Sequence, residues 1–368
     1  MACWIQCIAI QTKTEIPQEF TTLQFDDQFL LLEDSQATFI ESSRISILKF
    51  DEIGKNLEFV FENKIADIQI LSLDTATEKI VKLFTQASKY LKFPYDVFVH
   101  KLSKSNPNWT AKEFIILPDY LIDVTAIASC FNTTGSNPLK HLIHLFYYSP
   151  SGYSTLLGTT VNQFLDDLIL NPSLQFEDLS QNLFQHNPIA FSLLDDSTII
   201  KYFETIKIHF SNIKTLIENK FEHPNLQLED CILEPSFYSV EYGIQGRLDV
   251  FHEDKINSKK WIIELKSGKP YLPNKFGINA DHHAQIMLYY LLIQSVFGRN
   301  YDVKSHVLYS AQLENALRYA PILDDIQQEL IYLRNAIIVL HLHLAFRNES
   351  DPSLFDILIA KHFQTTDS

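Results

Sequence analysis

Two apolar runs in the second half of the chain each place a carboxylate among hydrophobic residues. Residues 242–251 read YGIQGRLDVF and contain Asp249, and residues 259–267 read KKWIIELKS and contain Glu264. Burying an unpaired carboxylate costs several kcal/mol, so such positions normally carry a partner, a metal ion or a chemical task. Any fold of this chain therefore has to bring compensating groups to both positions.

The spacing of these runs predicts a β-hairpin. Side chains alternate between the two faces of a strand, so Glu264 and Lys266 share one face of residues 259–267. Fourteen residues separate Asp249 from Glu264, and the middle of that interval, HEDKINSKK, is polar and turn-prone. A hairpin would place Asp249 beside Glu264.

Paired carboxylates next to a lysine indicate metal-assisted hydrolysis. Two neighbouring carboxylates repel each other unless a cation lies between them, and oxygen ligands suit Mg²⁺ or Mn²⁺. Lys266 would then orient a water molecule or stabilise negative charge that builds on a phosphate. The alternative is an ordinary ion-pair cluster of Asp249, Glu264 and Lys266 on an exposed sheet edge.

Composition and net charge limit the class of protein. With 368 residues, of which 46% are hydrophobic and 20% charged, we expect a folded protein with two cores. Neither a membrane-spanning run nor a signal peptide is evident, so we expect a cytoplasmic protein with no membrane partner. The four scattered cysteines, Cys3, Cys7, Cys130 and Cys231, indicate neither a zinc ribbon nor a disulfide framework.

The net charge of −15 argues against a nucleic-acid partner, but the local charge differs. Between Gln245 and Lys275 there are seven basic residues and four acidic ones. This basic island predicts a DNA-binding surface, and its alternative is a solvated lysine-rich turn. The predicted DNA-binding residues are Arg247, Lys259, Lys260, Lys269 and Lys275.

The periodicity of hydrophobic residues divides the chain in two. Strand-like runs at residues 3–11, 20–32, 37–50, 57–63 and 66–73, with a helix at 75–91, predict a β-rich N-terminal domain over residues 1–100. The polar stretch 100–113 is expected to be a linker. Residues 114–368 then form a second domain in which helical patterns dominate. The sequence has no P-loop motif, which excludes a P-loop ATPase.

The ordered motifs YGIQGRLDV, IIELKSGK and HHAQIMLYY resemble those of the PD-(D/E)xK nuclease superfamily, in its RecB-like branch. The chain looks closest to the nuclease module of nuclease-helicases that act in DNA replication and end resection. Most of the chain after residue 117 takes part: PDYLIDVTAIAS resembles the opening of that module, LLGTTVNQFL its next helix and LRNAI its closing helix.

The resemblance implies an α/β (α+β) fold: a restriction-endonuclease-like core with a small mixed sheet flanked by helices, preceded by the β-rich domain. It implies metal-dependent cleavage of single-stranded DNA, with Mg²⁺ or Mn²⁺ as cofactor and a helicase module or subunit as a further partner. The implied catalytic residues are Asp249, Glu264, Lys266, Gln285 and Tyr289, and the predicted metal site comprises Asp249, Glu264, Leu265 and Asn162.

Two departures from the family pattern affect these expectations. Asn162 stands where the family has a histidine, and an amide oxygen shifts metal preference toward Mg²⁺. Many relatives hold an iron-sulfur cluster through one cysteine after the opening motif and three near the C-terminus. Cys231 is the last cysteine here, so we expect no cluster, and we expect residues 338–346 to close the fold by docking near Cys130.

Two other readings of the function stay open. A catalytically weak nuclease fold that binds DNA or scaffolds a helicase partner is favoured by Asn162 but disfavoured by Asp249, Glu264 and Lys266. A protein-binding module is favoured by the net charge and by the β-rich N-terminal region.

Overall fold

The structure is a computed structural model that describes residues 39–62, 67–73, 78–105, 107–146, 152–219, 221, 226–255, 257–353 and 356. These residues belong to one compact unit, Phe39–Ser368. The strands predicted at 3–11 and 20–32, together with Cys3 and Cys7, lie outside the described residues. The fold is a mixture of sheets and helices with a β-rich N-terminal region, as predicted.

The first sheet has six strands in the order β1-β2-β3-β5-β4-β6, and β1 also pairs with β4. These pairings close β1, β2, β3, β5 and β4 into a ring, with β6 added to β4. Alternate residues of β1 such as Ile45 and Ile47 are fully buried inside it. The elements are β1 (Phe39–Asp51), β2 (Asn56–Phe61), β3 (Gln69–Ser72), α1 (Glu78–Tyr90), β4 (Tyr95–Ser105), β5 (Asn108–Thr110) and β6 (Glu113–Ile116).

The predicted linker at residues 100–113 is wrong. This stretch contains the end of β4, all of β5 and the start of β6. It looks polar because one side of β4 faces solvent, whereas Leu102 and Trp109 are buried on the other side. The division into domains at residues 100 and 114 stays a prediction.

A short segment after β6 joins this sheet to the rest of the unit. It contains β7 (Ile122–Asp123), α2 (Val124–Ala128), β8 (Phe131–Asn132), β9 (Gly135–Ser136) and α3 (Leu139–Phe146). The guanidinium of Arg334, which is 1% exposed, donates to the main-chain carbonyls of Leu117 (2.9 Å) and Tyr120 (2.6 Å) and to that of Gly243 (3.1 Å). Gly243 has φ +61°, and a Cβ there would collide with this guanidinium. One buried cation thus fixes the path of the connection.

The central sheet has five strands in the order β10-β13-β14-β15-β16. β13 and β14 form the predicted antiparallel hairpin, and β14 pairs with β15 in parallel. In a smaller sheet, β12 lies between β11, with which it pairs antiparallel, and β7, with which it pairs in parallel. The strands are β10 (Cys231–Leu233), β11 (Ser236–Ser239), β12 (Ile244–Arg247), β13 (Val250–Asp254), β14 (Lys259–Lys266), β15 (Asp302–Tyr309) and β16 (Leu317–Tyr319).

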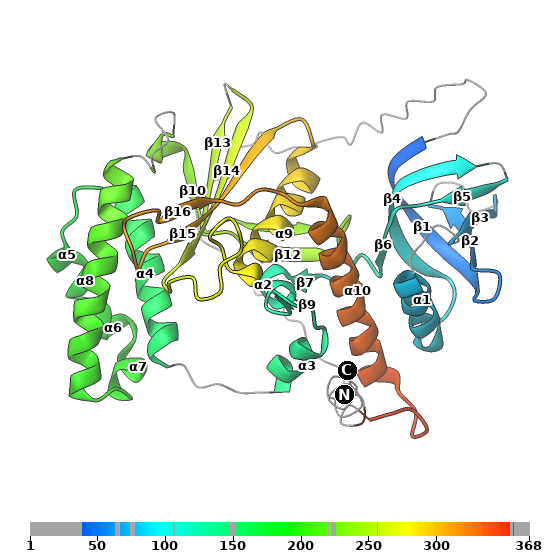
Figure 1. The fold of residues 1–368 in the computed structure, drawn as a ribbon, viewed down its shortest axis with the longest axis horizontal. Helices are drawn as coiled ribbons and strands as arrows, with labels where there is room; N and C mark the ends of the chain where they lie inside the picture. Colours follow the sequence, from blue (N-terminus) through cyan, green and yellow to red (C-terminus); the bar gives the residue numbers. More distant parts are fainter. Residues whose placement is uncertain are drawn as a thin grey trace, which may run out of the picture. The chain divides into compact units, whose positions relative to one another are not determined.

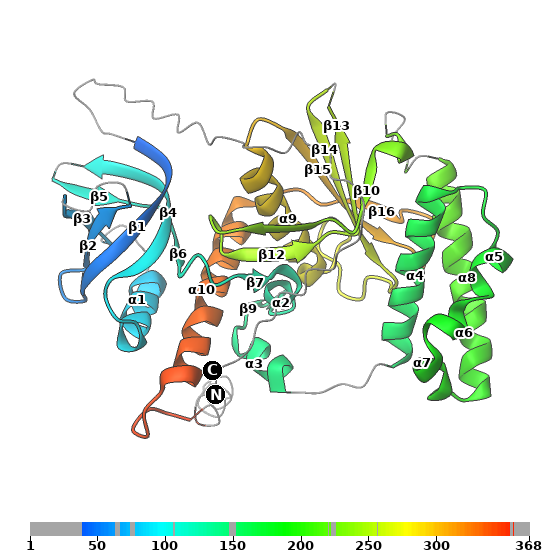
Figure 2. The ribbon, with the colours of Figure 1, turned by 180° about the vertical axis from the view of Figure 1, so that it is seen from behind.

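Helices cover both faces of the central sheet, as Figures 1 and 2 show from opposite sides. One face packs against α9 and belongs to a first core, which continues into the β1–β6 sheet, whereas Ile263 and Leu265 of β14 point into a second core with α4 and α8. The helices are α4 (Tyr153–Leu170), α5 (Phe176–Ser180), α6 (Leu183–His186), α7 (Pro188–Ser192), α8 (Asp196–Glu218), the 3₁₀ helix η2 (Leu228–Asp230), α9 (Ala280–Phe297) and α10 (Asp324–Phe346).

The closing helix α10 contacts α2 and α3, which confirms that the C-terminal apolar helix docks near Cys130. The ring nitrogen Nε2 of His341 lies 2.9 Å from Nε2 of His141 on α3, and the phenol of Tyr120 lies 3.1 Å from Nδ1 of His341. Among the described residues, α10 is the helix that has the length and hydropathy of a membrane span, and 56% of that window is buried inside the protein. A buried core helix passes the same test.

Candidate active site

The β13–β14 hairpin brings Asp249 to the end of β14, as predicted. Val250 pairs with Ile263, so the residue before Val250 reaches the level of Glu264 and Leu265. The carboxylate Oδ2 of Asp249 accepts a hydrogen bond from the main-chain N–H of Leu265 at 2.6 Å. Leu265 itself points its side chain into the second core, so only its main chain faces the site.

Glu264 is 4% exposed and is the centre of a hydrogen-bond network. Its Oε1 accepts from Nζ of Lys266 at 2.9 Å and from Nε2 of Gln285 at 2.8 Å. Its second oxygen, Oε2, is buried and has no hydrogen-bond partner among the described residues. A buried carboxylate oxygen without a partner is costly, and one explanation is a cation or ligand that completes the site.

Helix α9 supplies the other two predicted residues from one of its faces. Gln285 and Tyr289 are four residues apart, so they share one face of α9, and Nε2 of Gln285 donates to the Tyr289 hydroxyl at 3.2 Å. Oε1 of Gln285 accepts from Nζ of Lys266 at 2.8 Å, and the phenol of Tyr289 donates to the main-chain carbonyl of Arg247 at 2.6 Å. The structure therefore brings together all five predicted catalytic residues.

Burial and charge shift the ionisation of this cluster. Desolvation raises the pKa of Asp249 well above its ordinary value, and the neighbouring carboxylate of Glu264 raises it further. Desolvation by itself would lower the pKa of Lys266, but the Glu264 carboxylate outweighs it and holds the pKa of the ammonium above its ordinary value. Lys266 thus stays a cation, and its single positive charge lies next to two carboxyl groups, those of Asp249 and Glu264.

Asn162 lies on α4 and turns toward Glu234, because its Nδ2 donates to Glu234 Oε1 at 2.9 Å. One helical turn later, Asp166 points an oxygen, Oδ1, into a buried position without a hydrogen-bond partner among the described residues. Desolvation, followed by the charges of Glu234 and Asp167, raises the pKa of Asp166 to about 7. The charge of Asp166 in turn contributes to the raised pKa of Asp249, so the two carboxyls are electrostatic neighbours.

Asp166 and Glu234 are residues that the sequence reasoning missed. The spacing of Asn162 and Asp166 contained a signal for one of them, since positions i and i+4 share a helical face. The sequence contains no comparable signal for Glu234, because this residue follows a short strand and no recognisable motif surrounds it. Its Oε2 accepts from the Arg247 guanidinium at 3.2 Å.

A divalent cation fits these residues on chemical grounds. Within the described residues, no group of three or more His, Cys, Asp or Glu side chains is arranged to hold a metal ion. Mg²⁺, however, is commonly bound through one or two carboxylates, with waters and substrate phosphates as the remaining ligands. Asp249 and Glu264 are such a pair, and Glu264 Oε2 is the unpartnered oxygen that this role requires.

The predicted DNA-binding residues separate into two groups. Arg247, Lys269 and Lys275 are exposed and lie in or next to segments that carry the carboxylates. Lys259 is half-buried at the opposite end of β14. The prediction for Lys260 is wrong: its side chain is fully buried, pairs with Glu253 and lies 4.0 Å from the ring centre of Phe297 and 3.9 Å from that of Tyr301.

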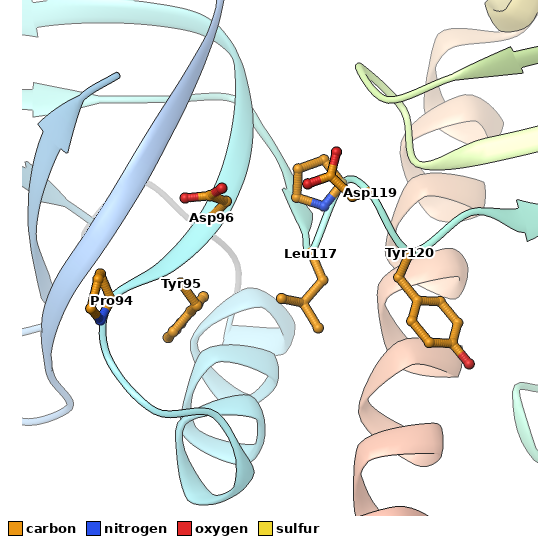
Figure 3. A pocket seen from close by; sticks show the side chains of 7 residues that line it. Pro94, Tyr95, Asp96, Leu117, Asp119 and Tyr120 are labelled. Carbon is orange, nitrogen blue, oxygen red and sulfur yellow. The ribbon is translucent and has the colours of Figure 1, made fainter. Parts of the chain in front are cut away.

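A cavity of about 500 Å³ is formed by other residues. Figure 3 shows Tyr95 and Asp96 on one side of it and Leu117, Asp119 and Tyr120 on the other. Its two carboxylates are already paired with Arg44, at 2.7 Å for Asp96 and 3.0 Å for Asp119. This cavity is therefore not part of the carboxylate cluster.

Comparison with known proteins gives little that bears on function. No protein-family model matches the chain, and no curated protein matches it. Among solved structures, the chain is similar to the crystal structure of a candidate exonuclease from Eubacterium rectale, with a TM-score of 0.37 and 10% sequence identity. The match covers 62% of this chain and 82% of that one.

Proposed function

We propose that this chain is a metal-dependent nuclease of the PD-(D/E)xK type, RecB-like branch, that hydrolyses phosphodiester bonds of single-stranded DNA. The observation that carries the proposal is the buried oxygen Oε2 of Glu264, which has no hydrogen-bond partner among the described residues and lies beside Asp249 and the ammonium of Lys266. The buried carboxylate of Glu264, bonded to Lys266 and Gln285 and flanked by the half-buried Asp249, suits the hydrolysis of a phosphodiester.

Asp249 and Glu264 would hold the cation, with water and the main chain near Leu265 as further oxygen donors. A bound Mg²⁺ or Mn²⁺ supplies Lewis-acid polarisation of a phosphate oxygen and offsets the charge of the two carboxylates. Asn162 lies one turn from Asp166 on α4, so it borders the same site, although its amide nitrogen is already bound to Glu234.

Lys266 and Gln285 perform the remaining roles in the proposal. The ammonium of Lys266 is held by Glu264 and Gln285, and the lysine side chain is 19% exposed, so the ammonium can donate a hydrogen bond to a phosphate oxygen. Gln285 contacts both Glu264 and Lys266 and therefore fixes their relative position. Tyr289 anchors α9 to the chain just before Asp249 through the carbonyl of Arg247. Roles in DNA replication or repair and a helicase partner are part of the same proposal.

The proposal is tested with the full chain on labelled single-stranded DNA, with duplex DNA and RNA as comparisons, in Mg²⁺, in Mn²⁺ and in EDTA. We expect cleavage that requires the metal and that Asp249→Asn abolishes. Cleavage that persists in EDTA or in Asp249→Asn would contradict it.

A second candidate is a catalytically weak nuclease fold that binds DNA or a helicase. The hydrogen bond between Asn162 and Glu234 favours it, because this amide occupies the position of the family's histidine. Metal-independent DNA binding without cleavage in the same assay would select this function.

A further inference from the structure

A groove borders the candidate active site, between the β8–β9 hairpin and the loop that follows β14. Asn132 and Lys140 line one wall, and Tyr271, Leu272 and Asn279 line the other. Asp281, in the first turn of α9, also lines it. Asp281 precedes Gln285 by four residues, so it lies on the same helical face one turn away, and its charge acts on the Lys266 ammonium. The groove therefore continues the site along α9.

Asn279 presents an unused hydrogen-bond donor in this groove. The residue is 2% exposed, and its Nδ2 has no hydrogen-bond partner among the described residues. Its other amide atom, Oδ1, is fully used, because it accepts from the main-chain N–H groups of Tyr271 (3.1 Å) and Leu272 (3.3 Å). A buried NH₂ group without an acceptor costs free energy, so a ligand that supplies an acceptor would bind favourably.

The loop next to the groove displays an aromatic side chain on a fixed backbone. Tyr271 is 71% exposed and Leu272 is 60% exposed, although Asn279 holds both of their main-chain nitrogens. The same loop is braced further on, where the side chain of Asn274 accepts from the N–H groups of Phe276 (2.9 Å) and Ile278 (3.2 Å). An exposed ring on an ordered loop is preorganised for stacking, because little conformational freedom is lost on binding.

Around the groove three lysines stand against one carboxylate, Asp281, a balance that suits an anionic strand. Lys269 and Lys275 are exposed in the loop that carries Tyr271, and Lys140 stands on the opposite wall. The enclosed part of the groove holds about 40 Å³, which is close to the volume of a single water molecule. A whole nucleobase does not fit there, so a base would lie on the exposed ring of Tyr271 with only one polar edge inserted toward Asn279.

We propose that this groove is a subsite for a nucleotide next to the scissile phosphate of single-stranded DNA, with its base stacked on Tyr271 and its edge accepting a hydrogen bond from Asn279. The proposal rests on the proposed nuclease function and adds to it the residues that recognise the substrate. Stacking tolerates any base, so the subsite confers a preference for unpaired strands rather than for a sequence.

The test measures binding of fluorescent single-stranded oligonucleotides without metal. One oligonucleotide has normal bases, and one of the same length has abasic residues. We expect Tyr271→Ala to raise the Kd of the normal oligonucleotide about 10-fold, Tyr271→Phe to keep it near the wild-type value, and neither change to affect the abasic one. The matched control is Tyr238→Ala, which removes a tyrosine of similar exposure (66%) from β11 and should leave Kd unchanged.

Asn279→Asp keeps the oxygen that holds the loop and removes the unused donor, but it also adds a buried negative charge, which acts on normal and abasic strands alike. We expect a lower melting temperature, some loss of affinity for the abasic oligonucleotide, and a larger loss for the normal one, so that the difference between the two strands measures the donor. Equal losses on normal and abasic strands in Tyr271→Ala, or the same loss in Tyr238→Ala, would overturn the subsite.

A parallel cleavage assay with Mg²⁺ separates the two proposals. Binding that depends on Tyr271 without any cleavage by the wild-type protein supports the subsite and rejects the nuclease. If the wild-type protein cleaves DNA and Tyr271→Ala changes neither cleavage nor binding, the nuclease proposal is supported and the subsite is rejected.

Discussion

Two lysines on the same face of β14 show how differently one strand uses buried charge. Lys260 and Lys266 are six residues apart, so strand alternation points both toward α9. Lys260 meets the last turn of α9 through Phe297, whereas Lys266 meets its second turn through Gln285. The side chain of Lys260 is 0% exposed and that of Lys266 is 19% exposed.

The surroundings of the two ammonium groups explain the difference. Lys260 is enclosed by the rings of Phe251, Phe297 and Tyr301, and Glu253 neutralises it. This arrangement is complete without a ligand. Lys266 instead pairs with Glu264, whose second oxygen has no hydrogen-bond partner among the described residues. A second acid, Asp249, lies close enough to both for their charges to act on it. A buried charge thus indicates a functional site when some of the polar groups around it lack partners. It indicates a purely structural role when all of these groups are paired.

The largest effect should come from removing the lysine of the incomplete network. Lys266→Met keeps an unbranched apolar side chain that is one atom shorter, and it removes the donor that contacts Glu264 and, in the proposal, the phosphate. We expect cleavage of single-stranded DNA to fall by about 1,000-fold, a size typical of a lost catalytic donor. Single-turnover cleavage in Mg²⁺ measures it, with Lys260→Met as the matched control. Similar activity in the two variants would remove the distinction between these lysines.

The same control has its own expected effect, on stability. Lys260→Met removes the cation from its aromatic cage and leaves Glu253 without its partner, although Glu253 retains contact with water. We expect the free energy of unfolding to fall by about 1–3 kcal/mol. Cleavage per folded molecule should stay within about twofold of wild type. Urea unfolding and active-site titration measure the two quantities, and a stable variant that loses cleavage would contradict the structural role.

A smaller effect is expected on the pH dependence of stability, because more carboxyl groups than cations lie near the Lys266 end of β14. Burial raises the folded-state pKa of Asp166 to about 7 and that of Asp249 well above its ordinary value. Their unfolded-state pKa is about 3.9, so between these values the folded state binds more protons and stability falls as pH rises. Buried histidines act in the opposite direction, because burial lowers the pKa of His100, His141 and His209 to about 4 and the unfolded state therefore binds more protons near pH 5. We therefore expect the carboxyl effect as a difference: the melting temperature of Asp166→Asn should gain a few degrees on that of the metal-free wild type between pH 5 and pH 7.5.

Mg²⁺ should narrow this difference at pH 7.5, because a cation replaces the protons in the wild type. Glu204→Gln, a change at an exposed site on α8, should show no such gain over the wild type. Thermal melts at both pH values measure the melting temperatures. An Asp166→Asn variant that gains nothing on the wild type between pH 5 and pH 7.5 would show that burial does not raise the pKa of this carboxyl.

The smallest expected effect is on the salt dependence of DNA binding, and it is tested by comparing lysines at the two ends of β14. Lys269 and Lys275 follow the Lys266 end, and Lys259 lies at the Lys260 end. If each loop lysine contacts one phosphate, neutralising both to glutamine should lower the salt slope of single-stranded DNA binding by about 1.4, at roughly 0.7 per phosphate. Lys259→Gln should leave the slope unchanged. A slope that responds to Lys259 instead would place the DNA at the wrong end of β14.

Local patterns in the sequence predicted the part of the site that local geometry builds. The polar interval between Asp249 and Glu264 and the alternation around Glu264 were enough to predict the hairpin. The spacing of Gln285 and Tyr289 was enough to predict their common face. These relations depend on strand and helix periods, which the sequence contains directly.

What the sequence did not reveal depends on contacts between distant segments. Lys260 read as an exposed cation because nothing nearby in the sequence announces that Phe297 and Tyr301 will enclose it. Asp166 drew no prediction, since only the tertiary fold brings its charge close enough to Asp249 to raise the pKa of that carboxyl. We interpreted residues 100–113 as a linker because the strands they form face solvent on one side and therefore contain many polar residues. The strands that pair with them, such as β1, are distant in the sequence, so the local pattern did not reveal the pairing.

The carboxyls of the candidate site come from both sides of the central sheet. Asp166 belongs to α4, within the second core, whereas Glu264 and Gln285 lie on the face that packs against the first core. A cation or a DNA strand that engages both groups would act as a cross-link between two hydrophobic clusters. Such a ligand makes the folding of one cluster depend on the other, since it binds only when both are formed. Calorimetry should then record a broad or divided transition for the bare protein and a single sharper one for the loaded protein.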